Sequence, residues 1–201
     1  MKFSVIMASY LGDYPTAAKN RNNKILRAIN SVVNQTFTDW ELIVVADGCK
    51  KTIDIVTKIE EKRVSCYWIP KAKQWSGEPR NKGIEVSKGE FIVYLDIDDI
   101  LGENHLKNIS DHLGTYDWVW FDDIRYDPKS ENWYENPCEI EKIGRHGTSN
   151  VCHKRLLPVK WDHTGYAHDY YFIAQLRDIN NFTKINNGEY YVAHIPGIYD
   201  L

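Results

Sequence analysis

Residues 90–99 read EFIVYLDIDD, a short apolar run that ends in three aspartates within four positions. Short runs rich in β-branched and aromatic side chains are typical of a buried strand. An open parallel sheet binds ligands at the carboxyl ends of its strands, which is where Asp96, Asp98 and Asp99 would lie. Crowded carboxylates repel unless a cation or a proton is shared, so the pattern predicts a site for Mg²⁺ or Mn²⁺.

Similar apolar runs occur on both sides of this segment, and helix-like segments separate them. We expect strands at residues 2–9, 41–46, 64–69, 90–95 and 117–121, and a last short strand at 190–195. We expect helices at residues 25–33, 52–61, 78–88, 106–113 and 169–179. This alternation predicts an α/β fold with a mainly parallel central sheet flanked by helices. Residues 122–150 show no regular period, and we expect loops and edge strands there.

Two details of this pattern bear on the core and on the sheet edge. Ile25, Leu26, Ile29, Val32 and Val33 share the spacing of one inward helix stripe. Acidic residues also follow the second and fifth expected strands, at positions 47, 122 and 123. We therefore expect these acids at the same sheet edge as residues 96–99.

Length and composition set limits on the kind of protein. The 201 residues, 43% of them hydrophobic, are enough for one domain that buries about 70% of its unfolded surface. A net charge of −3 argues against a nucleic-acid partner. The sequence shows no run long enough to span a membrane and no secretory leader, so we expect a cytoplasmic protein. Peripheral membrane contact and the oligomeric state stay open.

The cysteines are widely spaced. Cys49, Cys66, Cys138 and Cys152 form no C-x-x-C pair, so neither a zinc clip nor a disulfide framework is indicated. We expect all four as reduced thiols.

Several segments, in order, resemble one known family. They read SVIMASY at residues 4–10, SVVNQTFTDWELIVVADG at 31–48, RNKGI at 80–84, GEFIVYLDIDD at 89–99 and HD at 168–169. This series is similar to the family 2 glycosyltransferases of the GT-A fold. The resemblance implies a Rossmann-like single domain over residues 1–201, with a nucleotide-binding half (1–100) and an acceptor-binding half (101–201) that has a small subsheet.

The resemblance also implies residue roles. Tyr10 would stack on the base, Asp47 would accept a hydrogen bond from it, Arg80 would lie near the diphosphate, and Asp99 would support its neighbours. The implied nucleotide-binding residues are Ala8, Tyr10, Asp47, Arg80 and Asp96; the implied metal ligands are Asp96, Asp98 and His194; the implied general base is Asp169.

Two positions depart from the family pattern. His168 stands where members usually carry Glu, which leaves the role of this position in doubt, and Ala46 stands where another Asp is frequent. Asp169 itself fits a role in the pocket, because Phe172 and Ile173 lie three and four residues further on and place it on the inward helix face.

The function implied is a metal-dependent, inverting transfer of sugar from a nucleotide-diphosphate donor to a hydroxyl of a glycan or other acceptor. UDP is the expected nucleotide and Mn²⁺ or Mg²⁺ the expected cofactor. A basic cluster would assist with phosphate, and exposed aromatic rings would stack on acceptor sugars. The cluster comprises Lys71, Lys73, Arg80 and Lys82, and the rings are Trp75, Trp120, Trp133 and Tyr166.

Two other functions compete with this one. A haloacid-dehalogenase-type phosphatase would use Asp96 as nucleophile and Asp98 as acid and base, although its motif normally lies near the start of the domain. A catalytically silent module would bind nucleotide or glycan without turnover, and the substitution at His168 keeps this alternative open.

Overall fold

The computed structural model describes residues 1–14, 17, 19–73, 75–163 and 165–193. Along the chain these form β1 (Phe3–Ser9), α1 (Arg21–Val33), β2 (Trp40–Asp47), α2 (Lys50–Val56), β3 (Val64–Ile69), α3 (Gly77–Val86), β4 (Phe91–Tyr94), β5 (Ile100–Leu101), α4 (His105–Ser110), β6 (Trp118–Asp127), β7 (Asn132–Asn136), a 3₁₀ turn η1 (Thr148–Asn150), β8 (Val151–Lys154), α5 (His168–Arg177) and β9 (Phe182–Val192).

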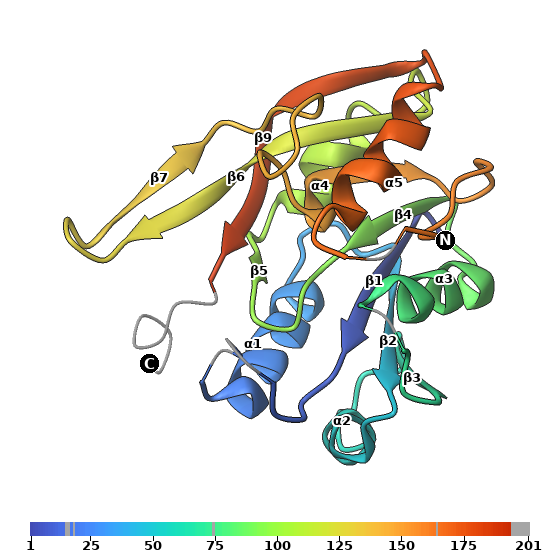
Figure 1. Cartoon of the computed structure of the whole chain (residues 1–201), viewed down its shortest axis with the longest axis vertical. Helices are drawn as coiled ribbons and strands as arrows, with labels where there is room; N and C mark the ends of the chain where they lie inside the picture. The colour runs from blue at the N-terminus through green and yellow to red at the C-terminus, as the bar shows by residue number, and fades with distance from the viewer. Residues whose placement is uncertain (15–16, 18, 74, 164, 194–201) are drawn as a thin grey trace.

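The strands form one continuous sheet in the order β3-β2-β1-β4-β8-β6-β9-β5, with β7 paired to β6 (Figure 1). The first four strands in this order are parallel. β8 is antiparallel to both β4 and β6, whereas β6 and β9 are again parallel. The expected α/β fold with a central sheet flanked by helices is confirmed, and antiparallel pairs are concentrated in its second half.

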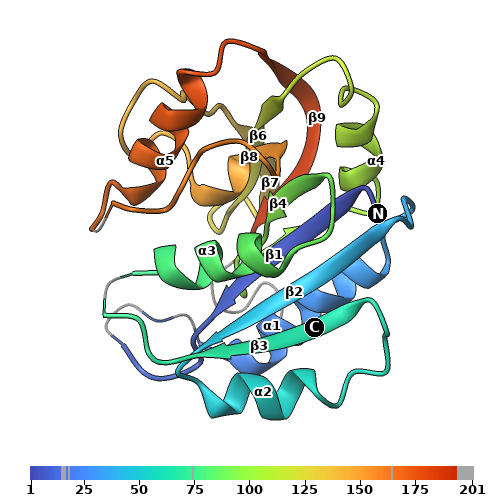
Figure 2. The ribbon, with the colours of Figure 1, turned by 90° about the vertical axis from the view of Figure 1, so that its right-hand side faces the viewer.

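Alternate residues of the central strands serve two separate cores. Phe3, Val5 and Met7 of β1 face one side, where they join α1, α2 and α4. Ile6 of β1 and Tyr94 of β4 face the other side, where they join α3 and α5. Figure 2 shows α1 and α2 on one side of β1–β3, with α3 and α5 on the other. Strand side chains alternate between faces, so both sides of these apolar strands are covered.

Two glycines allow the close approaches that position the crevice. A Cβ at Gly83 in α3 would lie 2.4 Å from Ile6 Cγ2, so glycine lets this helix rest directly on β1. Gly48 has φ +60 and its N–H donates to the Ile69 carbonyl at 2.9 Å, which turns the chain sharply after β2. These contacts explain why the sequence carries glycine in RNKGI and in ADG.

The second half of the chain differs from the sequence expectation. β6 continues to Asp127, so Asp122 and Asp123 lie within a strand and not beyond its end. Asp122 accepts the Cys138 N–H at 2.8 Å and pairs with Lys184 at 2.7 Å. The last strand is also much longer than expected, beginning at Phe182. β5 and β8 were not expected, whereas β7 lies within residues 122–150, where we expected loops and edge strands.

Smaller differences concern the first half. Leu26 is 39% exposed, so the buried stripe of α1 is narrower than its spacing predicts. α2 begins at Lys50 and ends at Val56, earlier at both ends than the expected helix. The four cysteines are free, as expected. Within the described ranges, the structure contains no helix with the length and apolar character needed to cross a membrane.

Candidate active site

A crevice of about 520 Å³ opens beyond the carboxyl ends of β1, β2 and β4. Its walls come from the ends of these strands and the loops after them, from the loop between β3 and α3, from the start of α3, and from η1 and α5 with the residue before η1. They comprise Ala8, Ser9, Tyr10, Tyr14, Asp47, Lys71, Trp75, Ser76, Pro79, Arg80, Asp96, Ile97, Gly147, Thr148, His168 and Asp169. Six of the predicted site residues therefore meet in one place: Ala8, Tyr10, Asp47, Arg80, Asp96 and Asp169. Asp98 does not line the crevice, and His194 lies outside the described residues.

One end of the crevice holds a carboxylate, an ammonium group and an aromatic ring, which belong to Asp47, Lys71 and Tyr10. The buried carboxylate of Asp47 accepts the Ala72 N–H and the Lys71 ammonium, each at 2.5 Å. The Lys71 ammonium also lies 4.3 Å from the centre of the Tyr10 ring. Each carboxylate oxygen of Asp47 already accepts one bond, and its remaining lone pairs are still able to accept another donor.

The three acids after β4 lie in different surroundings. The Asp96 side chain is 41% exposed and accepts a bond from Arg80 Nη2 at 3.1 Å. Asp99 is buried and accepts bonds from the Tyr190 hydroxyl at 2.6 Å and the Ala193 N–H at 2.7 Å. Burial, followed by the charges of Asp98 and Asp96, raises the pKa of Asp99 well above its usual value. Asp99 thus ties this loop to β9.

The acidic loop after β4 concentrates carboxylates that would suit a divalent metal ion. Among the described residues, no three His, Cys, Asp or Glu side chains come together as a metal-binding group. The charges of Asp98 and Asp96 nevertheless raise the pKa values of both Asp99 and Tyr14, after the larger effect of burial, so the loop is a region of negative potential. Carboxylate oxygens are the ligands that hard divalent cations prefer. The residues present therefore fit Mg²⁺ or Mn²⁺ in their chemistry.

Asp169 lies in the first turn of α5, at the opposite wall. Its Oδ1 atom accepts the Thr148 hydroxyl at 2.8 Å and lies 2.7 Å from His168 Nε2. Burial alone would raise the pKa of Asp169, but the hydrogen bond and charge of His168, the charge of Arg80 and the Thr148 hydrogen bond outweigh it and lower the pKa. The carboxylate is therefore ionised at neutral pH, the form that a base needs.

His168 joins Asp169 to the other wall of the crevice. Its Nδ1–H donates to the Gly165 carbonyl at 3.0 Å, and its ring stacks on Trp75 with centroids 5.6 Å apart. Its Nε2 lies 3.2 Å from Arg80 Nη1. His168 thus links Asp169 to Arg80 and Trp75 across the crevice.

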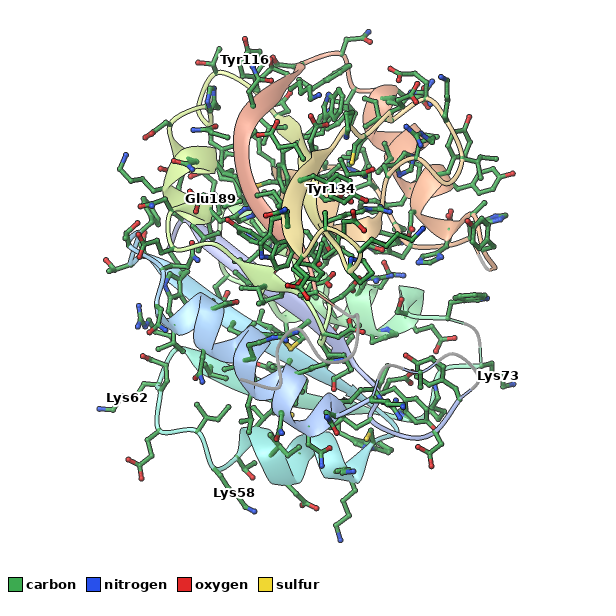
Figure 3. All side chains as sticks on the ribbon, turned by 90° about the vertical axis from the view of Figure 1, so that its left-hand side faces the viewer. Lys58, Lys62, Lys73, Tyr116, Tyr134 and Glu189 are labelled. Carbon is green, nitrogen blue, oxygen red and sulfur yellow. The ribbon has the colours of Figure 1, made fainter. Side chains whose placement is uncertain are left out.

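Other expected clusters are only partly assembled. Of the basic cluster, Lys82 pairs with Glu85 at 2.7 Å, and Lys73 projects outward from the molecule (Figure 3), which leaves Lys71 and Arg80 at the crevice. Of the expected stacking rings, Trp75 is 56% exposed and lines the crevice. The Trp120, Trp133 and Tyr166 side chains are not among its walls.

Sequence reasoning missed Gly147 and Thr148, which form the wall beside Asp169. They belong to residues 122–150, where periodicity gave no element. No local pattern marks them, since the segment that follows, VCHK, which becomes β8, has only two apolar residues.

The fold is that of an α/β protein of the GT-A class. Residues 16–179 match the model of Glycosyl transferase family 2, and the chain belongs to this family. Among curated relatives, the poly(ribitol-phosphate) β-N-acetylglucosaminyltransferase TarP of Staphylococcus aureus is 34% identical over 113 residues, 54% of this chain and 32% of TarP. An uncharacterized glycosyltransferase of Rickettsia bellii is 34% identical over 106 residues, 53% of this chain and 14% of that protein.

Solved structures share the fold. S. aureus TarS 1–349 in complex with UDP-GlcNAc has a TM-score of 0.77 at 20% identity, covering 98% of this chain and 60% of that one. The mannosyltransferase PcManGT of Pyrobaculum calidifontis, in complex with GDP-Man and Mn²⁺, has a TM-score of 0.71 at 14% identity, covering 98% of this chain and 58% of that one. The chain thus spans about a third or less of the two curated relatives.

Proposed function

We propose that this chain transfers a sugar from a nucleoside-diphosphate donor, with UDP as the nucleotide, to a hydroxyl group of a glycan or other acceptor. The observation that carries the proposal is the single crevice that gathers Tyr10 and Asp47 at one end with Asp96, Arg80 and Asp169 at the other. Family membership supports it, as does the UDP-GlcNAc bound by TarS, which shares the fold.

The two halves of the domain would have different tasks. Residues 1–100 contribute Ala8, Tyr10, Asp47, Arg80 and Asp96 to the crevice, and these would bind the nucleotide and diphosphate. Residues 101–201 contribute Thr148 and Asp169, beside which the acceptor would react. Arg80 Nη2 bonds to Asp96 and its Nη1 contacts His168, so one guanidinium joins the two halves.

Asp169 is the proposed general base. An alcohol is almost fully protonated at neutral pH, and a carboxylate that removes its proton as the new bond forms typically gives about 10²- to 10⁴-fold in rate. The Thr148 and His168 contacts engage Oδ1, which leaves Oδ2 to take that proton. A single in-line displacement would invert the sugar carbon, so an α-linked donor would yield a β-linked product.

Departure of the diphosphate is the second task. Arg80, only 4% exposed, presents a fixed positive charge toward this part of the crevice. Asp96 and Asp98 would hold Mn²⁺ or Mg²⁺, and the bound ion would supply further positive charge for the leaving diphosphate. A role for His194 at this ion stays a prediction from the resemblance.

The competing functions are less well supported. The family match spans residues 16–179, and it points to transfer rather than to a phosphatase with Asp96 as nucleophile. A silent binding module would share the crevice, and turnover distinguishes it from the enzyme. Release of UDP from a UDP-sugar by the purified chain would exclude the silent module.

Calorimetric titration with UDP, in the presence and absence of Mn²⁺, tests the proposal. We expect the parental protein to bind UDP, and to bind it more tightly when Mn²⁺ is present. In Asp98→Asn we expect Mn²⁺ to leave the affinity for UDP unchanged. Asp111→Asn, an exposed acid at the end of α4, is the matched control and should retain that effect. A parental protein that binds no UDP under either condition would contradict the proposal.

A further inference from the structure

The buried indole ring of Trp161 joins the two halves of the domain behind the crevice. Trp161 precedes α5 in the chain and is only 4% exposed. Its ring stacks on Phe172 of α5 with centroids 3.8 Å apart, and it meets the ring of Tyr94 of β4 edge-on with centroids 5.3 Å apart. One side chain therefore packs against both the strand that leads to the acidic loop and the helix that carries Asp169.

Two side-chain amides hold the backbone at this point. Asn81 of α3 donates to the Trp161 carbonyl at 2.9 Å and accepts the Trp161 N–H at 3.0 Å. Gln175 of α5 makes the same pair of bonds with Lys160, donating to its carbonyl and accepting its N–H, each at 2.9 Å. Because α3 and α5 lie on the same side of the sheet (Figure 2), the chain at residues 160–161 is fastened to both helices.

The indole nitrogen of Trp161 is fixed as well. Its N–H donates to the Tyr94 hydroxyl at 3.1 Å, and this hydroxyl lies 2.8 Å from His153 Nε2. The Nδ1–H of His153 donates to the Lys154 carbonyl at 2.9 Å, so Nε2 is the atom that accepts the tyrosine proton. These bonds, together with the stacking on Phe172, set the plane of the Trp161 ring.

Arg80 lies against this fixed ring. Its guanidinium carbon is 4.8 Å from the centre of the Trp161 ring, and Arg80 is itself only 4% exposed. An aromatic face attracts a guanidinium through the charge distribution of the ring and not through a hydrogen bond. The contacts of Arg80 with Asp96 and His168 both involve its N–H groups. The contact with Trp161 uses none of the five N–H donors, which are the groups that a diphosphate needs.

A second buried tryptophan has the same packing without a cation. Trp118 belongs to the same core cluster as Trp161 and is fully buried. Its indole N–H donates to the Ile179 carbonyl at 3.0 Å, and its ring stacks on Phe182 with centroids 4.2 Å apart. Among the residues that the structure describes, no Lys or Arg lies over the Trp118 ring. The contact with Arg80 thus distinguishes Trp161 from an ordinary core tryptophan.

We propose that Trp161 is a positioning residue that holds the Arg80 guanidinium toward the diphosphate of the bound nucleotide. This inference rests on the proposed function, because that function assigns Arg80 to the diphosphate. Trp161 is not among the walls of the crevice, so it acts through Arg80 and not by contact with the substrate. Its loss should therefore weaken only the part of nucleotide binding that depends on phosphate.

The test compares the binding of UDP with that of uridine, which has the same base and ribose but no phosphate. Calorimetry gives the Kd of UDP, and titration by ligand-detected NMR gives the Kd of uridine, both at one Mn²⁺ concentration. The proteins are the parental chain, Trp161→Leu, Trp161→Phe and Trp118→Leu. Trp118→Leu is the matched control, because it removes a buried indole ring and one indole hydrogen bond from the same core cluster.

In Trp161→Leu we expect the Kd of UDP to rise by about three- to tenfold, the size of a lost cation–aromatic contact, while the Kd of uridine stays within twofold. Trp161→Phe retains an aromatic face and should restore most of the affinity for UDP. Trp118→Leu should leave the ratio of the two Kd values at its parental value.

Fluorine NMR provides a second measurement if either leucine variant does not fold. In the parental protein labelled with 5-fluorotryptophan, the Trp161 and Trp118 signals are assigned from their loss in Trp161→Phe and Trp118→Phe. We expect the Trp161 signal to shift with UDP but not with uridine, because the diphosphate changes the charge that faces the ring. The Trp118 signal should stay in place with both ligands.

Failure of the positioning role is distinguishable from failure of the proposed function. If the parental protein binds no UDP, the proposed function is wrong. If it binds UDP, the positioning role alone is overturned by a Kd ratio in Trp161→Leu within twofold of the parental ratio, or by an equal change in Trp118→Leu. Equal losses in Trp161→Phe and Trp161→Leu would overturn it too, because the aromatic face would then have no effect. Where a leucine variant does not fold, a Trp161 signal that ignores UDP has the same meaning.

Discussion

Arg80 contacts three separate parts of the site, whereas the resemblance to the family implied only a position near the diphosphate. Its guanidinium bonds to Asp96, contacts His168 and lies 4.8 Å from the centre of the Trp161 ring. These three contacts come from the loop after β4, from α5 and from the segment before α5. A single buried cation thus fixes the distance between the acidic loop and the proposed base. Lys at this position would lack the planar fork that makes these contacts.

Thr148 tunes the proposed base. Its hydroxyl bond favours the ionised form of Asp169 and contributes to the lowered pKa of that carboxyl. In Thr148→Val we therefore expect the pKa of Asp169 to rise, so that the base becomes protonated at higher pH. The acid limb of kcat should move up by as much as about one pH unit.

The measurement is kcat between about pH 3 and 7 for the parental protein, Thr148→Val and the exposed control Thr115→Val, because the pKa of Asp169 is lowered from its ordinary value of 3.8. An acid limb that stays in place in Thr148→Val would show that this hydroxyl does not act on the group that controls catalysis.

His105 should make stability depend on pH. It is fully buried against Phe121, and burial lowers its pKa to about 3. Between this value and the ordinary value of 6.5, the unfolded chain binds a proton that the folded chain does not, so stability falls as pH falls through this window. His105→Leu removes this penalty. His153, whose pKa burial lowers to about 4, contributes in the same direction.

Urea unfolding at pH 7 and pH 5 provides the test. The parental protein should lose about 2 kcal/mol more than His105→Leu between these pH values. Equal losses in the two proteins would mean that His105 is not buried in its neutral form.

At the scale of elements, α3 packs closely against β1 because Gly83 has no side chain at the point of contact. A Cβ at Gly83 would lie 2.4 Å from Ile6 Cγ2, and α3 also carries Arg80. We expect Gly83→Ala to push the helix outward, to lower the free energy of unfolding by about 1–3 kcal/mol and to weaken UDP binding.

Glu85→Ala, on the exposed face of α3, is the matched control, because it removes only a surface ion pair with Lys82. Chemical denaturation and UDP titration of both variants provide the measurement. If Gly83→Ala is as stable as Glu85→Ala, the close helix–strand contact is not the reason for glycine here.

The first four strands could be predicted because each is a compact apolar run followed by a polar turn. Once β1, β2 and β4 are parallel neighbours, Ala8, Tyr10, Asp47 and Asp96 must share one sheet edge. β8 could not be predicted: its four residues, VCHK, carry no period, and it lies between β4 and β6, which are distant in sequence. Asp122 and Asp123 were misplaced for a related reason, since pairing with β7 and β9 extends β6 beyond its apolar start.

The crevice wall beside Asp169 depends on contacts between residues far apart in the sequence, which no local sequence pattern indicates. Thr148 lies 21 residues before Asp169 and reaches it only because η1 and the start of α5 converge. His146 is a second residue whose surroundings could not be predicted. It is buried in the structure, but an isolated histidine in a polar stretch of sequence gives no indication of burial. Sequence therefore located the crevice residues after β1, β2 and β4 together with Arg80 and Asp169, whereas the wall formed by Gly147 and Thr148 required the three-dimensional structure.

At the scale of the whole molecule, the crevice lies between the parallel half of the sheet and the mixed half. Figure 1 shows β1–β4 on one side of this boundary and β6, β7 and β9 on the other. The chain covers 60% of the TarS 1–349 structure and 32% of TarP, so those proteins carry further parts that this chain does not match. Donor and acceptor chemistry should therefore be measured on this chain itself.

The central claim is that Asp169 acts as the base of a sugar transfer from a UDP donor. The most direct test compares kcat for transfer, and the Kd of UDP, between the parental protein and Asp169→Asn. We predict that kcat falls by about 10²- to 10⁴-fold while the Kd of UDP stays unchanged, because the amide cannot take the acceptor proton. Transfer by Asp169→Asn at the parental rate would contradict the claim.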